Sequence, residues 1–308
     1  MYRRFLLILL WLWLAVAPAA AAEPARFCVA SDTRGRVGFV RILEQIAQIP
    51  GGPGQFLITA GDMDPLPTTQ SQLDSVFGKA FLWYPVVGNH EAALHKSLKG
   101  VDDMTYLRDL YNKQLKGKVN PGPEGARETT YSFDAGEMHI AIINQYWNGK
   151  TAPGSDRKGV GSVVAPLREW LKADLQGSRK PWKLVVAHEP AFPQPDRDWA
   201  VERHGEDALT LDPKARDAFW AVLEEQGVAA YICAHTHRYS RYQPPGSKVW
   251  QIDTAQARAT SDWKYDAFVI VTVDEKSLEF NTYRNLKEAG KFEVTDVLKL
   301  TPAKAPPR

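Results

Sequence analysis

The sequence predicts an α/β layered fold in which antiparallel strands extend the sheets. Two observations predict it. From residue 25 onward, short apolar runs typical of buried strands alternate with segments of helical periodicity. In addition, a hairpin-like segment lies near the middle of the chain, and three β-rich runs with little helical pattern fill residues 248–284. A succession of strand, loop, helix and strand is the pattern of a layered α/β (α+β) domain.

The first 22 residues have the three-part pattern of a secretory signal peptide. Arg3 and Arg4 precede an apolar run from Phe5 to Ala17, and small residues lead to a cleavage site after Ala22. An uncleaved anchor helix is the alternative, but this run is shorter than the ~20 residues needed to span a bilayer. We therefore expect a periplasmic or secreted protein without a stable membrane anchor.

The composition excludes several classes of protein. The chain has 308 residues, with 38 Lys and Arg, 36 Asp and Glu, and only 2 Cys. The two surplus positive charges belong to the leader, so the mature chain is formally neutral. Disordered, collagen-like and disulfide-scaffold proteins are excluded, and a broad nucleic-acid-binding surface is not expected. The oligomeric state is left open.

The predicted elements follow in order along residues 23–300, which we take as one domain before a disordered tail at 301–308. Helical stripes lie at Val40–Ile49 and Leu167–Leu175, and a third helix begins at Pro213 and stops at Gly227. The hairpin pairs Thr129–Phe133 with Met138–Asn144. The predicted buried strands are Phe27–Ala30, Phe56–Ala60, Tyr84–Val87, Leu184–Ala187 and Tyr231–Ala234.

Cys28 and Cys233 both fall in predicted buried strands. Two buried free thiols are the simpler interpretation. A disulfide is the alternative, because an oxidising compartment permits one without guaranteeing bridgeable geometry.

Polar side chains cluster where the predicted buried strands stop. In open α/β sheets, the loops beyond the carboxyl ends of the strands form the ligand crevice, so five such ends can converge. Oxygen and imidazole ligands suit first-row divalent or trivalent metals, and the absence of thiolates excludes a cysteine-type zinc site. The candidate ligands at these strand ends are Asp32, Asp62, Asn89, His188, His235 and His237.

The order of these motifs resembles that of the calcineurin-like metallophosphoesterases, a family that includes the purple acid phosphatases. The resemblance runs from Cys28 to about Arg241, and its most specific pieces are the segments Gly88–Glu91 and His235–His237. It implies a two-sheet β-sandwich flanked by helices, two bound metal ions (Mn, Fe or Zn) and a small phosphate ester as substrate.

The resemblance also implies a role for each motif residue. Asp62 would bridge the ions, with Asp32 and His237 on the first and Asn89, His188 and His235 on the second. His90 would stand beside the substrate as general acid or phosphate-oxygen donor, held by Glu91. Two ions can lower the pKa of a bridging water and clamp the oxygens of an in-line phosphoryl displacement.

One residue departs from the family pattern. Arg34 stands where the family usually has a histidine ligand, and a guanidinium offers no lone pair to a metal. The first site therefore lacks one protein ligand unless a tyrosine, Asp64 or water fills it. Arg34 could instead contact phosphate, or it could pair with Asp32 or Asp64 as structural support.

Two further segments are candidates for the pocket wall. The loop from Ala191 to Leu211, which contains His204, exceeds the ~12–15 residues beyond which loops are often functional. Tyr146 and Trp147 follow the hairpin and either border the pocket or pack in the core.

The sequence thus favours an exported phosphoesterase that uses metal-activated hydroxide. Two alternatives stay open: a phosphate-ligand binding protein that has lost turnover through a weakened first site, and an exported nuclease or phosphodiesterase. Neither the natural substrate nor the preference for mono- or diesters follows from the residues.

Overall fold

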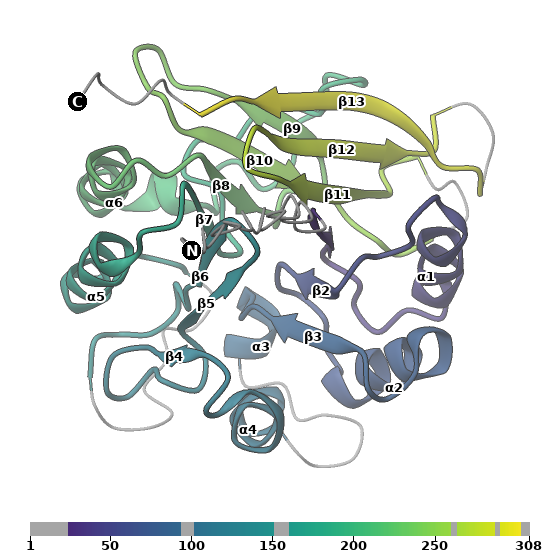
Figure 1. The fold of residues 1–308 in the computed structure, drawn as a ribbon, viewed down its shortest axis with the longest axis horizontal. Helices are drawn as coiled ribbons and strands as arrows, with labels where there is room; N and C mark the ends of the chain where they lie inside the picture. Colours follow the sequence, from purple (N-terminus) through teal and green to yellow (C-terminus); the bar gives the residue numbers. More distant parts are fainter. Residues whose placement is uncertain (1–23, 94–101, 151–159, 260–263, 287–289, 303–308) are drawn as a thin grey trace, which may run out of the picture.

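The computed structural model describes residues 24–93, 102–150, 160–259, 264–286 and 290–302. The predicted signal peptide and nearly all of the predicted tail lie outside these ranges. Within them, two mixed β-sheets pack face to face and helices cover their outer faces (Figure 1). No helix of the described residues is long and apolar enough to cross a membrane.

The first sheet combines a parallel and an antiparallel half. β1, β2 and β3 pair in parallel, whereas β11 pairs antiparallel with β1 and continues into an antiparallel meander. Its strands, in spatial order, are β13 (Glu293–Leu300), β12 (Leu278–Arg284), β11 (Ala267–Val273), β1 (Ala25–Ala30), β2 (Phe56–Thr59) and β3 (Leu82–Pro85).

The second sheet has a parallel centre with antiparallel margins. β6, β7, β8 and β10 run in parallel, and the predicted hairpin forms β5 and β6. Its strands, in spatial order, are β4 (Asn120–Pro121), β5 (Tyr131–Ala135), β6 (Met138–Ile142), β7 (Trp182–Val186), β8 (Ala230–Cys233), β10 (Trp250–Thr254) and β9 (Tyr239–Tyr242).

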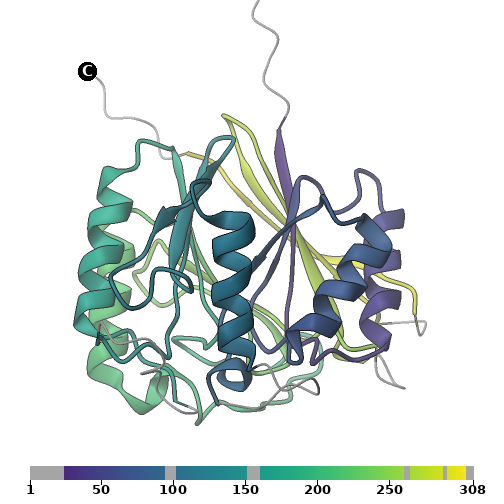
Figure 2. The same ribbon diagram turned by 90° about the horizontal axis from the view of Figure 1, so that it is seen from below.

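Helices cover the outer face of each sheet, as Figure 2 shows. In α1, Phe39, Ile42, Leu43 and Ile46 recur at helical spacing and are fully buried against the first sheet. The helices are α1 (Gly38–Gln48), α2 (Leu66–Phe77), α3 (Asn89–Ala92), α4 (Asp103–Leu110), α5 (Ala165–Gly177) and α6 (Pro213–Glu225), with short turns η1 (Tyr111–Leu115) and η2 (Leu209–Leu211). α1 and α2 lie on the first sheet, and α5 and α6 on the second.

Aromatic rings join the two sheets in the core between them. Tyr84 of β3 stacks on Phe133 of β5 with ring centroids 4.0 Å apart, and Phe56 of β2 meets the same ring edge-on at 5.5 Å. Offset stacks and edge-to-face pairs contribute about 0.5–1.5 kcal/mol each beyond their buried area. These contacts fix the sheets relative to each other, and with them the loops at the strand ends.

The structure adds elements that the sequence patterns did not predict. The sequence patterns do not indicate α2, α4, β9 and β13: α2 has a weak apolar stripe, β9 is a four-residue strand with only two buried residues, and β13 is partly exposed along its length. The strand predicted at Tyr84–Val87 runs from Leu82 to Pro85, and the helix predicted at Leu167–Leu175 runs from Ala165 to Gly177. Cys28 and Cys233 are buried and free, as the simpler interpretation holds.

Candidate metal centre

The polar strand ends meet at one edge of the two sheets. Asp32 follows β1, Asp62 follows β2 and Asn89 begins α3 after β3, whereas His188 follows β7 and His235 follows β8. Backbone hydrogen bonds tie the first loops together, from Asp32 N to Gly61 O at 3.0 Å and from Arg34 N to Asp62 O at 2.9 Å. The backbone N–H of His235 donates to Asp32 Oδ2 at 3.1 Å and so connects the two sheets at this edge.

Several of these residues have a left-handed backbone conformation that residues other than glycine seldom adopt. The φ angles are 50° at Asp32, 53° at Arg34, 56° at Asp62, 72° at His235 and 56° at His237. Such conformations cost of order 1–3 kcal/mol each and cluster at functional sites. Their concentration at one sheet edge marks this edge as a functional site.

Two glycines, Gly61 and Gly88, let the loops that carry the candidate ligands pack closely against one another. A Cβ atom on Gly88 would lie 2.3 Å from Asp62 Oδ1, and one on Gly61 would lie 2.3 Å from the Nδ1 atom of His188. Real Cβ atoms do not approach other atoms so closely. The glycines of the Gly-Asp and Gly-Asn-His-Glu motifs are therefore required for packing around the candidate ligands.

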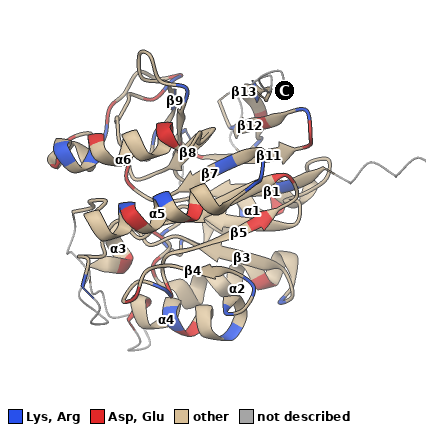
Figure 3. Cartoon of the chain, turned by 60° about the vertical axis from the view of Figure 1, so that its left-hand side comes forward, with Lys and Arg blue, Asp and Glu red and all other residues tan. Residues whose placement is uncertain are grey.

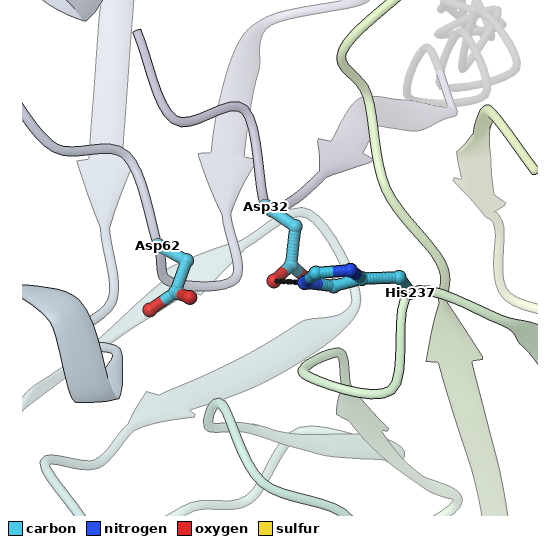
Figure 4. A group of neighbouring side chains, drawn as sticks. All are labelled: Asp32, Asp62 and His237. Atoms are coloured by element: carbon cyan, nitrogen blue, oxygen red, sulfur yellow. Dashed lines mark ion pairs between the residues drawn. The ribbon is translucent and has the colours of Figure 1, made fainter. Parts of the chain in front are cut away.

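The first group of candidate ligands consists of Asp32, Asp62 and His237 (Figure 4). One ligand atom from each lies within 4.8 Å of the others, and Asp32 Oδ1 is 3.0 Å from His237 Nε2. All three side chains are buried. By distance and chemistry, this group could hold a divalent metal ion.

Burial and charge set the protonation of this first group. Burial raises the pKa of Asp32, but the charges of His237, His188 and Arg258 outweigh it and hold that pKa below its usual range. Burial lowers the pKa of His237 to about 4, despite the opposing charge of Asp32, so the imidazole is neutral at pH 7. Burial and the charge of Asp32 raise the pKa of Asp62, which a nearby cation would lower.

The second group consists of Asn89, His188 and His235, with Asp62 beside them. His188 Nε2 lies 3.1 Å from Asn89 Oδ1, 3.3 Å from His235 Nδ1 and 3.4 Å from Asp62 Oδ1. His235 Nδ1 is 3.2 Å from the same Asn89 oxygen. Ligand atoms of Asn89, His188 and His235 thus lie at the spacing that neighbouring ligands of one ion have when each bond is about 2.0–2.2 Å, and Asp62 Oδ1 lies at the same spacing from His188.

A second hydrogen bond orients the central histidine of this group. Nδ1 of His188 lies 2.7 Å from the backbone carbonyl oxygen of Ala60. Because a carbonyl only accepts, Nδ1 carries the proton and the lone pair of Nε2 faces Asn89 and His235. Metal-binding histidines characteristically have such a partner on the opposite ring nitrogen. The residues of the second group therefore fit a first-row divalent ion.

Glu91 supports the loops that carry the candidate ligands. Its carboxylate accepts backbone hydrogen bonds from Asp62, Met63, Asp64 and Gly88, at 2.7–3.1 Å. Burial, together with the charges of Asp62 and Asp64, raises the pKa of Glu91 to about 8, and a cation bound at the centre would lower it and favour the carboxylate that the four backbone donors face. We infer that Glu91 positions the backbone that presents Asp62.

Arg34 and His90 face each other beside the first group. Arg34 Nε pairs with Asp64 Oδ1 at 2.7 Å, and a second guanidinium nitrogen contacts His90 Nε2. His90 Nε2 is also 3.5 Å from Asp62 Oδ2. Both side chains keep about a quarter of their surface exposed, 27% for Arg34 and 25% for His90. The pairing with Asp64 thus leaves Arg34 accessible to a ligand.

A cavity of about 300 Å³ opens over these groups. His204 and Arg203 from the long loop line it together with Arg34 and His90, as predicted for that loop. A neighbouring cavity of about 520 Å³ is also lined by Arg203 and His204.

Tyr146 and Trp147, the other candidates for the pocket wall, pack in the core, and Tyr146 Oη donates to Glu189 Oε1 at 2.8 Å.

Sequence motifs did not reveal one further residue of the centre. Arg258 lines the cavity from the segment after β10, where no motif or strand-end pattern singles it out. Its closeness to Asp32 and His237 follows only from the pairing of β10 with β8 and of β11 with β1, which is long-range information.

The comparisons with known proteins agree with this geometry. Residues 25–239 match the calcineurin-like phosphoesterase family. An acid phosphatase from Aspergillus ficuum is 28% identical over 169 residues, which cover 44% of this chain but only 25% of that protein.

Two solved structures share the fold. GAP50, described as the anchor in the inner membrane complex of Plasmodium, superposes with a TM-score of 0.59 at 12% identity, covering 91% of this chain and 90% of its own. PhoD gives a TM-score of 0.58 at 12% identity, covering 93% of this chain and 71% of its own. With its two sheets, its buried Asp and His groups and the match over most of its length, the chain belongs to the calcineurin-like phosphoesterase family of hydrolases.

Proposed function

We propose that the protein hydrolyses a small phosphate ester at the cavity above the two ligand groups, and that it is exported before it acts. The convergence of Asn89 Oδ1, His188 Nε2, His235 Nδ1 and Asp62 Oδ1 carries the proposal, because these atoms form a preorganised site for a divalent ion. The similarity to an acid phosphatase over part of that protein's length supports a phosphomonoester as the substrate. The N-terminal leader pattern supports export.

A divalent ion held by the second group would lower the pKa of a coordinated water and polarise the phosphoryl group. Asp62 belongs to both groups: its Oδ1 lies 3.4 Å from His188 Nε2, and one of its oxygens lies within 4.8 Å of ligand atoms of Asp32 and His237. Asn89, His188 and His235 complete the set of protein ligands.

Arg34 and His90 are placed to bind and protonate the substrate. Arg34 points its guanidinium at the cavity while Asp64 fixes its Nε, so the remaining N–H groups can donate to phosphoryl oxygens in a bidentate manner. His90 lines the same cavity, and its Nε2 accepts from Arg34. Once Arg34 donates to the phosphoryl group instead, a protonated His90 can donate to the departing ester oxygen. Arg203 and His204 form the opposite wall and can contact the remainder of the substrate.

The charge distribution favours a small substrate over nucleic acid. Lys and Arg are interspersed with Asp and Glu along α4, α5 and α6 (Figure 3). Nucleic-acid binding depends on a continuous basic surface. The arginines at the cavity are instead accompanied by Asp64 and Asp207.

The test compares two phosphate monoesters with different leaving groups, in the presence of manganese. Because an alkoxide needs a proton more than p-nitrophenolate does, His90→Ala should lower kcat for an alkyl phosphate by about 10²–10⁴-fold and for p-nitrophenyl phosphate by much less. His204→Ala, which alters the opposite wall of the same cavity, is the matched control and should not make the loss depend on the basicity of the leaving group. Equal losses for both esters in His90→Ala would remove the proton-donor role, and no turnover of either ester by the wild type would overturn the proposed function in favour of a phosphate-binding protein.

A further inference from the structure

The two groups of candidate ligands differ in the side chains that their ligand atoms contact. At the first group, the guanidinium of Arg258 lies with Nη2 2.8 Å from His237 Nε2 and 4.0 Å from Asp32 Oδ1. Arg258 thus meets the two atoms that the family resemblance assigns to the first metal ion.

Arg258 is held firmly in this position. Its Nε donates to the backbone carbonyl oxygen of Asp32 at 2.6 Å, and its own backbone N–H donates to Asp266 Oδ1 at 2.9 Å. The segment that carries it has left-handed residues on both sides, Ala255 with φ 64° and Ala259 with φ 46°. The side chain is only 13% exposed. A strained, anchored segment with a nearly buried cation is a built feature of the site.

The contact with His237 competes directly with a metal ion. A guanidinium can only donate, so Nε2 of His237 accepts from Arg258. Asp32 Oδ1, 3.0 Å from the same nitrogen, then receives no hydrogen bond from it. A metal ion would need the lone pair of His237 Nε2 and would stand next to a fixed positive charge in a buried site. Arg34 adds a second guanidinium where the family usually supplies a further histidine ligand.

At the second group, no guanidinium competes with a metal ion for the lone pairs of the ligand atoms. The lone pairs of Asn89, His188 and His235 face one another and Asp62, at 3.1–3.4 Å. Within the described part of the chain, no Lys or Arg nitrogen lies at hydrogen-bond or ion-pair distance from these ligand atoms. The electrostatic environment therefore favours a metal ion at the second group and disfavours one at the first.

We propose that the guanidinium of Arg258 replaces the first metal ion, so that the protein binds a single divalent ion, at Asp62, Asn89, His188 and His235. In this arrangement Arg258 neutralises Asp32 and, together with Arg34, presents fixed positive charge to the phosphoryl oxygens. Unlike a metal ion, it provides no coordination position for water. The contact of Arg258 with phosphoryl oxygens rests on the proposed function, because that function identifies the substrate as a phosphate ester. The number of metal ions that the chain binds is independent of turnover.

The experiment counts ions in the full chain. Metal-depleted protein is equilibrated with excess Mn²⁺, freed of unbound metal by gel filtration and analysed by inductively coupled plasma mass spectrometry and electron paramagnetic resonance. We expect one Mn²⁺ per wild-type chain with the spectrum of an isolated ion. The double variant Arg34→His, Arg258→Ala should bind two, with the spectrum of a spin-coupled pair. Arg241→Ala removes a comparably buried arginine, on β9 and paired with Asp296, and should still bind one.

Each outcome decides the proposal. Two ions on the wild-type chain, or none, would overturn it. A double variant that has the wild-type circular dichroism spectrum and still binds one ion would show that Arg258 is not what excludes the first ion. One ion on a wild-type chain that turns over no phosphate ester would support this proposal while overturning the proposed function.

Discussion

Asp32 Oδ1 and His237 Nε2 lie 3.0 Å apart, although Asp32 follows β1 of the first sheet and His237 lies after β8 of the second. The relationship exists only because the carboxyl ends of the central strands of both sheets open onto the same edge. Aromatic contacts between the sheets, such as that of Tyr84 with Phe133, maintain this alignment. The centre is therefore a property of the sandwich and not of either sheet alone.

Replacing Glu91 with glutamine should destabilise the protein. The amide nitrogen cannot accept the two backbone N–H groups that one carboxylate oxygen now serves, so buried donors lose their partner. We expect a loss of about 1–3 kcal/mol in the free energy of unfolding, measured by urea denaturation. Glu44→Gln, on the exposed face of α1, is the control and should change it little. A stable Glu91→Gln variant would show that the carboxylate is not needed to support the Asp62 loop.

His139 should stabilise the fold in a pH-dependent way. It is buried between Asp134 and Asp174, with nitrogen–oxygen distances of 2.7 and 2.8 Å. Burial lowers the pKa of His139, but the hydrogen bonds and charges of Asp174 and Asp134 outweigh it and leave that pKa above its ordinary value. Stabilisation by the imidazolium is thus fully present below about pH 6.5 and is lost as the pH rises through the folded-state pKa.

The corresponding variant is His139→Gln, studied by urea denaturation at several pH values. It should lose about 1–3 kcal/mol near pH 5.5 and progressively less at alkaline pH. A loss that does not vary with pH would mean that His139 acts only through packing or neutral hydrogen bonds.

Much of the fold and most of the candidate site could be predicted from local patterns. The buried strands are compact apolar runs in the sequence. Each is followed within a few residues by a polar residue that reaches the centre; Ala60, for example, is followed by Gly61 and Asp62. α2 and β13 escaped prediction because their apolar periodicity is weak and their packing is tertiary. Arg258 could not be predicted as part of the site, because nothing in the sequence around it indicates the aspartate and histidine that it contacts in the fold.

Arg284 should be essential for the loop that forms the cavity wall. The side chain is fully buried in β12 and pairs bidentately with Asp196, at 2.8 and 3.1 Å, and also with Asp198. Asp196 in turn accepts the backbone N–H groups of Asp198 and Trp199 within the loop that leads to Arg203 and His204.

Arg284→Met would leave the buried Asp196 without its counter-charge, at a cost of about 3–5 kcal/mol in the free energy of unfolding. Lys299→Met breaks the exposed pair with Glu279, at 3.2 Å, and should cost no more than about 1 kcal/mol. Thermal denaturation of both variants distinguishes the two effects. Comparable losses would contradict the assignment of Arg284 as the anchor of this loop.

The two cysteines should be unreactive in the folded protein. Cys28 and Cys233 are fully buried on β1 and β8, and burial raises the pKa of both thiols above the ordinary range. Thiolate, not thiol, is the reactive species. Ellman's reagent should therefore detect no thiol in native protein and both thiols in denaturant. A rapid reaction before unfolding would show that one of these strands opens readily.

The central claim is that this sheet edge is a metal-dependent phosphoesterase centre. It is tested most directly by the turnover of p-nitrophenyl phosphate by metal-depleted protein, before and after the addition of Mn²⁺, in the wild type and in folded His188→Ala. We expect no turnover without metal, recovery with Mn²⁺ in the wild type, and no recovery in His188→Ala. Turnover that persists in chelator, or an absence of turnover with every divalent metal, would contradict it.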